Sequence, residues 1–337
     1  MISENSRLAW TRISRRRWGL FPWTGFDSPA KRRIQRAAIV FSLAAVFVCG
    51  LCRFGFAETG DVWQPLTEKL VQDGFDRTYV SSLFGRSSLV FSPKIMARKM
   101  NALLNTKLSA KKPGPPREPE VMERYLNPIL IAGAYGFYRE HRDVMREIEQ
   151  KYSVPGDVLT ALMLVETKLG TQVGRYNALT ILGSMALGGD YELIRPYIKQ
   201  KNLADDTTEW LIRRTRQKGN WAYGELKSLI TYAQKNGQDP LIIPSSMYGA
   251  IGYCQFIPSS ALAYGRDGNG DGKVNLFEMN DALYSMAYFI KRHGWKPELD
   301  REAQLAVIYR YNHSKSYSLT IMAVADRLRK TSEFFGN

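Results

Sequence analysis

An almost continuously apolar segment lies between Val154 and Gly170, VPGDVLTALMLVETKLG. Pro155 suits the first position of a helix, where its missing N–H leaves no hydrogen bond unmade. Asp157 follows in the first turn, where a negative charge interacts favourably with the helix dipole. Apolar residues then occupy nearly every face, and this pattern predicts a helix that is buried on all sides.

Glu166 interrupts this segment near its end. On a helix, the residues three and four positions away are apolar or small: Leu162, Met163, Leu169 and Gly170. Burial raises the pKa of a carboxyl group, so Glu166 is predicted to hold a proton near neutral pH and to act as an acid. The structural alternative is an ion pair with Lys168 or a distant Arg, because buried carboxylates need partners.

Helical patterns cover most of the remaining chain, which predicts a mainly α fold with little β structure. Amphipathic pieces between residues 62 and 100 are followed by KKPGPPREPE at 111–120, a Pro-rich sequence typical of an extended linker. Further helices are expected at residues 127–151, 221–235, 281–293 and 301–310, and in a final segment that ends at Lys330.

The N-terminal region joins a basic stretch to an apolar run. Residues 1–36 are basic, residues 37–52 are apolar, and Gly55-Phe56-Ala57 has small residues at positions typical of a cleavage site. This order predicts a signal peptide or membrane anchor at 1–57, with the rest exported to the periplasm or cell envelope. An anchor would associate the chain with the inner membrane. Residues 58–120 then form an N-terminal helical region with the linker, and 121–337 form the main domain.

The chain of 337 residues has a formal net charge of +15. The first 57 residues contain ten Lys/Arg and two Asp/Glu, so they contribute +8 and leave +7 for the rest. Positive charge suits an anionic polymer or surface, but no helix-turn-helix, RNA-binding or zinc-finger pattern occurs, so no nucleic acid partner is expected. The polar, Arg-rich residues 188–219 are interpreted as a solvated helical insertion, with a basic flank for an acidic substrate as the alternative.

The sequence DGNGDGKVNLFE at residues 267–278 matches the calcium-binding loop of an EF-hand. Gly272 permits the sharp turn that such a loop needs. Because no second loop pairs with it, we expect a structural Ca²⁺ and not a sensor. The alternative is a turn that is simply rich in Gly and Asp. The predicted ligands are Asp267, Asn269, Asp271, the carbonyl group of Lys273, Asn275 and Glu278.

Two further segments place polar groups in an aromatic setting. SSMYGAIGYCQFIPSS at 245–260 contains glycines that allow close backbone approach and one amide, Gln255, so it either packs against a helix or lines a cleft. The turn YNHSKSY at 311–317 contributes Tyr311, Asn312 and Tyr317. Their flat faces and hydrogen-bonding tips suit a sugar, and core packing is the alternative.

These segments together resemble the membrane-bound lytic murein transglycosylases of the B type, within the lysozyme-like superfamily. The resemblance implies a lysozyme-like helical catalytic domain with an EF-hand-like calcium loop, which acts on peptidoglycan glycan strands. It also implies that Glu166 is the catalytic acid/base. The motifs that carry it are VETKLG at 165–170, GAIGYCQFIPSS at 249–260, the loop at 267–278, YNHSKSY at 311–317 and residues 74–96. The positions that it assigns to the sugar cleft are Ser246, Tyr253, Gln255, Tyr311 and Asn312.

The implied reaction cleaves the bond between N-acetylmuramic acid and N-acetylglucosamine. Since only one carboxyl group lies in an apolar setting, we expect the muramic 6-hydroxyl to attack and close a 1,6-anhydro ring. Glu166 would act first as acid and then as base. Two alternatives stay open, a hydrolytic muramidase and a non-catalytic, calcium-dependent wall-binding protein. The protein is expected to be a monomer.

Overall fold

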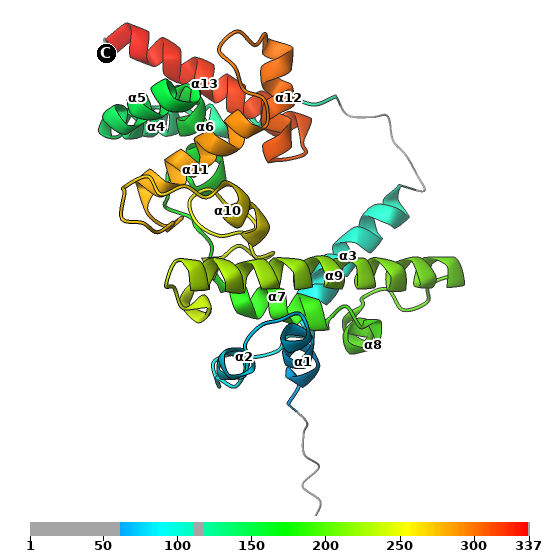
Figure 1. The fold of residues 1–337 in the computed structure, drawn as a ribbon. Helices are drawn as coiled ribbons and strands as arrows, with labels where there is room; N and C mark the ends of the chain where they lie inside the picture. The colour runs from blue at the N-terminus through cyan, green and yellow to red at the C-terminus, as the bar shows by residue number, and fades with distance from the viewer. Residues whose placement is uncertain (1–60, 111–117, 336–337) are drawn as a thin grey trace, which may run out of the picture. The chain divides into compact units, whose positions relative to one another are not determined.

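The chain is mainly helical over residues 61–110 and 118–335, the ranges that the computed structural model describes (Figure 1). The mainly α fold expected from the sequence is therefore confirmed. The predicted signal or anchor at residues 1–57 lies outside the described residues. None of the helices within 61–110 and 118–335 is long and apolar enough to cross a membrane.

Thirteen α-helices and one small sheet make up the described ranges. The helices are α1 Gln64–Gln72, α2 Arg77–Phe84, α3 Pro93–Ser109, α4 Pro128–Glu140, α5 Arg142–Tyr152, α6 Gly156–Thr167, α7 Ala178–Leu187, α8 Tyr191–Ile194, α9 Asp205–Lys235, α10 Pro258–Tyr264, α11 Met279–Arg292, α12 Arg301–Tyr311 and α13 Lys315–Phe335. Short 3-10 helices occur at Glu123–Tyr125, Arg195–Tyr197 and Pro240–Ile242. Strands β1 Tyr176–Asn177 and β2 Pro244–Ser245 pair antiparallel.

Helix α6 is the most deeply buried part of the fold. Nine of its twelve residues are buried, as its apolar sequence predicts, and Pro155 serves as its N-cap. It packs against α4, α5, α11 and α13, and Figure 1 shows α13 beside α4 and α6. This position places the two ends of α6 between other helices, so its polar side chains need partners there.

Two hydrophobic clusters divide the interior. The larger contains the residues of α6 with those of α4, α5, α11 and α13. The smaller joins α3, α7 and α9 through residues such as Met100, Met185 and Leu211. The N-terminal helices α1 and α3 pack against α7, while the domain boundary expected at residue 120 stays a prediction.

Two of the expected helices have different bounds. The pattern at 127–151 is not one helix, because α4 and α5 are separated at His141, whose ring contacts Phe137 at a centroid distance of 4.4 Å. In contrast, the polar segment before residue 219 continues directly into the helix expected at 221–235, forming the 31-residue α9. Gly219 lies inside α9 and contacts Gly189 so closely that a Cβ atom would clash there.

Candidate active site

Glu166 lies in the last turn of α6, and Tyr317 of α13 is its hydrogen-bond partner. The Tyr317 hydroxyl donates to Glu166 Oε1 at 2.6 Å. Desolvation raises the pKa of Glu166 to about 7, although the hydrogen bond from Tyr317 acts in the opposite direction. Among the described residues Glu166 has no ion pair, so the structural alternative of a partner such as Lys168 is not what the fold shows.

The backbone after α6 turns sharply and leaves Glu166 at the end of the helix. Lys168, Leu169 and Gly170 all have positive φ angles, of 48°, 59° and 87°. Leu169 N–H donates to the Met163 carbonyl at 2.9 Å, which closes the helix end. Positive φ at two successive non-glycine residues is uncommon, and such strain gathers at functional sites.

A stacked pair of tyrosines connects Glu166 to the Gly-rich segment. The rings of Tyr311 and Tyr317 are nearly parallel, with an angle of 10° and centroids 6.5 Å apart. The Tyr311 hydroxyl donates to the Cys254 carbonyl at 2.6 Å. Tyr317 is only 4 % exposed, so its ring belongs to the core and its visible polar contact is Glu166. Contact of Tyr317 with a sugar stays a prediction.

Tyr253 and Gln255 border the turn that follows α6. A Cβ atom added to Gly170 would lie 3.2 Å from the Tyr253 ring, so this ring packs directly on the turn. Gln255 has a φ of 50° and donates through Nε2 to the carbonyls of Val173 and Gly252, at 3.3 and 3.0 Å. Both side chains are half-buried. The segment therefore packs closely against the turn after α6, as one interpretation of its sequence expects, and a cleft lined by it stays a prediction.

The other two predicted sugar residues have contacts of a different kind. Ser246 Oγ accepts hydrogen bonds from Tyr248 N–H at 3.3 Å and Ala250 N–H at 3.1 Å, so it shapes the loop after β2. Asn312 ends α12 and is exposed. The hydrogen bonds and ring contacts thus join Glu166, Tyr317, Tyr311 and the 253–255 segment, while Ser246 and Asn312 lie outside this chain of contacts.

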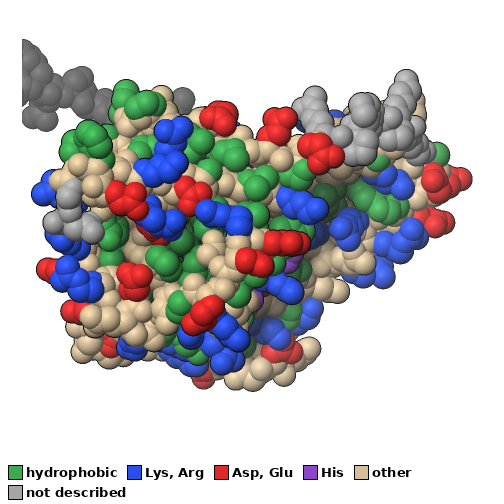
Figure 2. Space-filling view, turned by 90° about the horizontal axis from the view of Figure 1, so that it is seen from above, with side chains coloured by type: hydrophobic (Ala, Val, Ile, Leu, Met, Phe, Trp, Pro, Cys, Tyr) green, Lys and Arg blue, Asp and Glu red, His purple; other side chains and the backbone are tan. Residues whose placement is uncertain are grey.

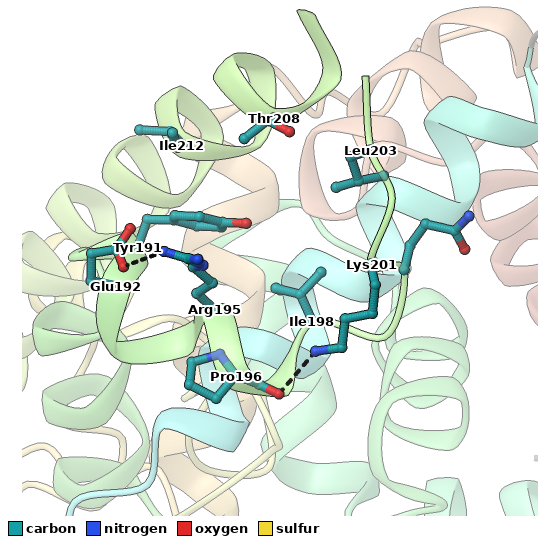
Figure 3. Close-up of a pocket in the computed structure, with 10 residues that line it drawn as sticks. Tyr191, Glu192, Arg195, Pro196, Ile198, Lys201, Leu203, Thr208 and Ile212 are labelled. Atoms are coloured by element: carbon teal, nitrogen blue, oxygen red, sulfur yellow. Dashed lines mark hydrogen bonds and ion pairs between the residues drawn. The ribbon is translucent and has the colours of Figure 1, made fainter. Parts of the chain in front are cut away.

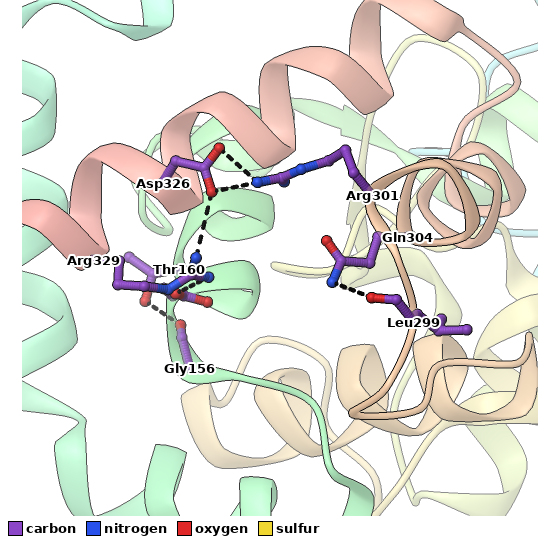
Figure 4. Close-up of polar contacts among 8 residues, drawn as sticks. Gly156, Thr160, Leu299, Arg301, Gln304, Asp326 and Arg329 are labelled. Atoms are coloured by element: carbon purple, nitrogen blue, oxygen red, sulfur yellow. Dashed lines mark hydrogen bonds and ion pairs between the residues drawn. The ribbon is translucent and has the colours of Figure 1, made fainter.

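A polar cluster at the opposite end of α6 was not anticipated from the sequence. Asp157 forms an ion pair with Arg329 of α13 at 2.7 Å, and its side chain is 14 % exposed. Figure 4 shows that Arg329 also contacts Asp326, which accepts two hydrogen bonds from Arg301 of α12. Desolvation raises the pKa of Asp157, and Arg329 opposes that rise. The Arg residues in the last helix gave no local signal, because their partners are distant in sequence.

The predicted calcium loop has side chains that converge on Glu278. Asn269 Nδ2 and Asn275 Nδ2 donate to its two carboxylate oxygens, at 2.6 and 2.9 Å. Asp267 accepts from Gly270 N–H at 2.6 Å and from Gly272 N–H at 2.8 Å. The donor set is all oxygen, which fits a hard cation such as Ca²⁺ once the two amides present their oxygens. No group of three His, Cys, Asp or Glu gathered as ligands occurs in the described ranges, so the site stays a prediction.

Asp281 anchors this loop, although the sequence comparison with an EF-hand does not mark it. It is 1 % exposed in the first turn of α11 and accepts from Gly268 N–H at 2.8 Å and from Asn275 N–H at 2.6 Å. Because α11 also packs against α6, the loop geometry is connected to the helix that carries Glu166.

Comparison with known proteins identifies the family. Residues 58–305 match the family described as the transglycosylase SLT domain. The chain belongs to this family. The chain is 26 % identical over 242 residues to the membrane-bound lytic murein transglycosylase B of Escherichia coli, a match that covers 71 % of the chain. The match spans 59 % of the length of that relative.

Solved structures of other SLT-domain proteins share the fold. The E. coli lytic transglycosylase SLT35 in complex with calcium is similar with a TM-score of 0.58 at 20 % identity, over 82 % of the present chain and 95 % of that chain. SltB3 from Pseudomonas aeruginosa in complex with NAG-anhNAM-pentapeptide is similar with a TM-score of 0.58 at 18 % identity, over 79 % and 78 %. These similarities confirm the lysozyme-like helical fold of this SLT-domain chain, and the EF-hand-like loop stays a prediction.

A cavity of about 750 Å³ lies apart from the Glu166 contacts, between α8 and the first half of α9 (Figure 3). Its walls include Tyr191, Arg195, Lys201 and Ile212, and none of the residues predicted for catalysis, sugar binding or calcium.

Proposed function

We propose that this protein is a lytic transglycosylase that cleaves peptidoglycan between N-acetylmuramic acid and N-acetylglucosamine. The observation that carries the proposal is the raised pKa of the Glu166 carboxyl group. Desolvation and the Tyr317 hydrogen bond account for its pKa of about 7, and no charged group among the described residues contributes. A carboxyl group with such a pKa can hold a proton at neutral pH and release it readily. Family membership supports this reaction class.

The expected reaction uses one carboxyl group twice. Neutral Glu166 donates its proton to the glycosidic oxygen as the bond from that oxygen to the anomeric carbon breaks. The Glu166 carboxylate then accepts the proton of the muramic 6-hydroxyl, whose oxygen forms the new bond to the anomeric carbon. No water is consumed, and Glu166 ends protonated as it began. The Tyr317 hydroxyl stabilises the carboxylate between the two steps by its hydrogen bond to Oε1.

Product analysis tests the proposed reaction. Purified sacculi digested with the protein are expected to release muropeptides that end in 1,6-anhydromuramic acid, lighter by one water than hydrolysed muropeptides. Products with reducing ends only would identify a muramidase instead. An absence of soluble products from a folded protein that still binds sacculi would favour the non-catalytic wall-binding alternative.

The proposal extends to calcium and to the cell envelope. A structural Ca²⁺ would fix the start of α11, and its ligands would be Asp267, Asn269, Asp271, the Lys273 carbonyl, Asn275 and Glu278. The complex of SLT35 with calcium supports this proposal. Because peptidoglycan lies outside the cytoplasm, the proposed substrate also implies that the protein is exported to the periplasm or cell envelope. A bound ion stabilises the fold by about 2.7 kcal/mol at a hundredfold excess over Kd. Glu278→Gln should lower the melting temperature in Ca²⁺ and remove its response to a chelator. A wild-type melting curve that ignores Ca²⁺ would count against the site.

A further inference from the structure

Three stretches of the chain carry Lys and Arg without a single acidic residue. They are α3 at residues 93–109, the segment 195–201, and the part of α9 at residues 210–224. Together they contain eleven Lys/Arg and no Asp or Glu. We call these three stretches the basic lobe. They pack on one another around the smaller hydrophobic cluster, so the charges of three separate segments are gathered on one part of the molecule.

The charge of the basic lobe is poorly compensated. Arg195 and Arg213 pair with Glu192 and Glu209, which flank the lobe. The pKa of Lys218 is lowered, first by desolvation and then by the positive charges of Lys99 and Arg214. Positive charges that lie close enough to lower the pKa of Lys218 indicate a site where an anion would be stabilised. In Figure 2, Lys and Arg side chains lie around a hollow in the surface, with Asp and Glu side chains near its rim.

Three Lys side chains of the basic lobe lie over aromatic rings. Lys99 lies over the Tyr248 ring at 4.3 Å from its centroid, and Lys107 lies over Trp210 at 5.1 Å. Lys218 lies over Trp221 at 5.4 Å. These contacts hold flexible ammonium groups at fixed places on the surface. An ordered basic surface loses less side-chain entropy on binding than a mobile one.

Two hollows flank the segment 195–201. One is the cavity of about 750 Å³ in Figure 3, where Arg195, Lys201 and Tyr191 line the wall. The other, of about 470 Å³, is lined by Lys94, Arg98 and Lys199. The segment between them is fixed, because Asn101 donates to the Tyr197 carbonyl at 3.0 Å and accepts from Lys199 N–H at 2.9 Å. Neither hollow contains a residue of α6 or α13, so both are separate from the Glu166 contacts.

We propose that the basic lobe binds the carboxylate-bearing peptides of peptidoglycan and so holds the wall polymer at a second place on the enzyme. This inference rests on the proposed function. Short anionic peptides match the lobe in charge, and their size fits concave hollows of a few hundred Å³. A flat anionic bilayer would contact the rim of these hollows and leave their basic walls unused. Charged contacts outside the catalytic centre raise the rate and strength of polymer binding without taking part in bond cleavage.

Binding to sacculi tests the proposal independently of catalysis. The measurement uses Glu166→Gln protein, which leaves the polymer intact, and determines Kd by sedimentation with purified sacculi. In that background, a basic-lobe variant carries Lys94→Gln, Arg98→Gln, Lys199→Gln and Lys201→Gln, all at exposed positions. A matched control carries Lys291→Gln, Arg292→Gln, Lys296→Gln and Lys330→Gln, also exposed and equal in charge. Melting temperatures establish that both variants are folded.

We expect the basic-lobe variant to bind sacculi at least about tenfold more weakly at low salt, and the control to change by less than about twofold. Added NaCl should weaken binding of the parent protein most, because the lobe is exposed to solvent. Free stem peptides, released from other sacculi by an amidase and added in excess, should compete with intact sacculi for the parent protein and should not change the binding of the variant.

Three results would overturn the proposal: equal losses in both variants, no competition by free stem peptides, or equally tight binding to vesicles of anionic phospholipid. The last would assign the lobe to a lipid surface. Failure of the proposed function itself would show separately, as wild-type protein that releases no anhydro products from sacculi.

Discussion

The two ends of α6 each carry a carboxyl group in a desolvated place, and they differ in the partner that α13 provides. At the first turn Asp157 pairs with the guanidinium of Arg329, at 2.7 Å. At the last turn Glu166 accepts a hydrogen bond from the neutral hydroxyl of Tyr317, at 2.6 Å. Desolvation raises the pKa of both groups, but the charge of Arg329 opposes it at Asp157, while the pKa of Glu166 reaches about 7.

The difference shows that burial and partner act separately on a carboxyl group. Burial removes water from both ends of α6 and favours the protonated form. A cationic partner opposes this effect at Asp157 and joins its side chain to a cluster of ion pairs that continues through Asp326 to Arg301 (Figure 4). A neutral partner leaves Glu166 able to gain and lose a proton near neutral pH. The same helix thus has an ion-paired carboxyl group at one end and, at the other, a carboxyl group whose partner is a neutral hydroxyl.

The largest expected effect separates the two carboxyl groups by activity. Glu166→Gln removes the titrating proton and keeps the side-chain shape, so lytic activity on sacculi should fall by at least about a thousandfold. Its melting temperature should be unchanged or higher, because strained functional sites commonly reduce stability. Asp157→Asn, the matched amide substitution, should keep activity within about tenfold of wild type. Near wild-type lysis by folded Glu166→Gln protein would end the assignment of Glu166 as the acid.

A second effect is the pH dependence of the free energy of unfolding, to which the raised pKa of Glu166 should contribute. The folded pKa of Glu166 is about 7, above the ordinary value of 4.5, so the unfolded chain loses this proton first as pH rises. Its contribution is therefore fully present below pH 4.5 and is lost as pH rises through 7, a change of about 3 kcal/mol. Glu166→Gln should lack this decline. Urea unfolding at pH 4.5 and pH 8 measures it, and equal pH dependence in the two proteins would contradict the raised pKa.

The two ends of α6 also show what the sequence could reveal. Glu166 was identified because one acidic residue interrupts an apolar helix, which is a local signal. Asp157 was assigned only a role with the helix dipole, because Arg329 lies far away in the chain and only packing of α13 brings it near. The same limit applies to Tyr317, which was grouped with possible sugar contacts although it lies against the acid.

Helix boundaries could also be predicted only where the signal was local in the sequence. The apolar pattern correctly predicted α6, whereas the separation of an insertion at 188–219 from a helix at 221–235 does not exist in the structure, where α9 is continuous. The glycine at 219 has a tertiary role, since a Cβ atom there would clash with Gly189 of the neighbouring segment. The loop at 267–278 could be found from spacing alone, but its anchor Asp281 needed the position of α11.

A smaller effect concerns the ion pair of Asp157 in the first turn of α6. Asp157→Asn removes the charge that faces Arg329, and we expect a loss of about 1–2 kcal/mol in the free energy of unfolding, since Arg329 stays partly exposed and hydrated. A double-mutant cycle with Arg329→Met measures the coupling between the two side chains by urea unfolding. A coupling energy near zero would show that Asp157 is held by packing and not by its ion pair.

The smallest expected effect concerns the neutral partner of Glu166. Tyr317→Phe keeps the buried ring and removes the hydroxyl that stabilises the carboxylate, so the pKa of Glu166 should rise further. The alkaline limb of the activity profile should then move to higher pH, by up to about one unit, because the acid keeps its proton longer. Turnover should fall several-fold at most, since the proton donor itself is intact. Tyr311→Phe is the matched control, because that hydroxyl donates to the Cys254 carbonyl and not to Glu166. Its alkaline limb should stay in place. A limb that moves equally in both variants would mean that general packing of the tyrosine pair, and not the hydrogen bond at Oε1, sets the pKa of Glu166.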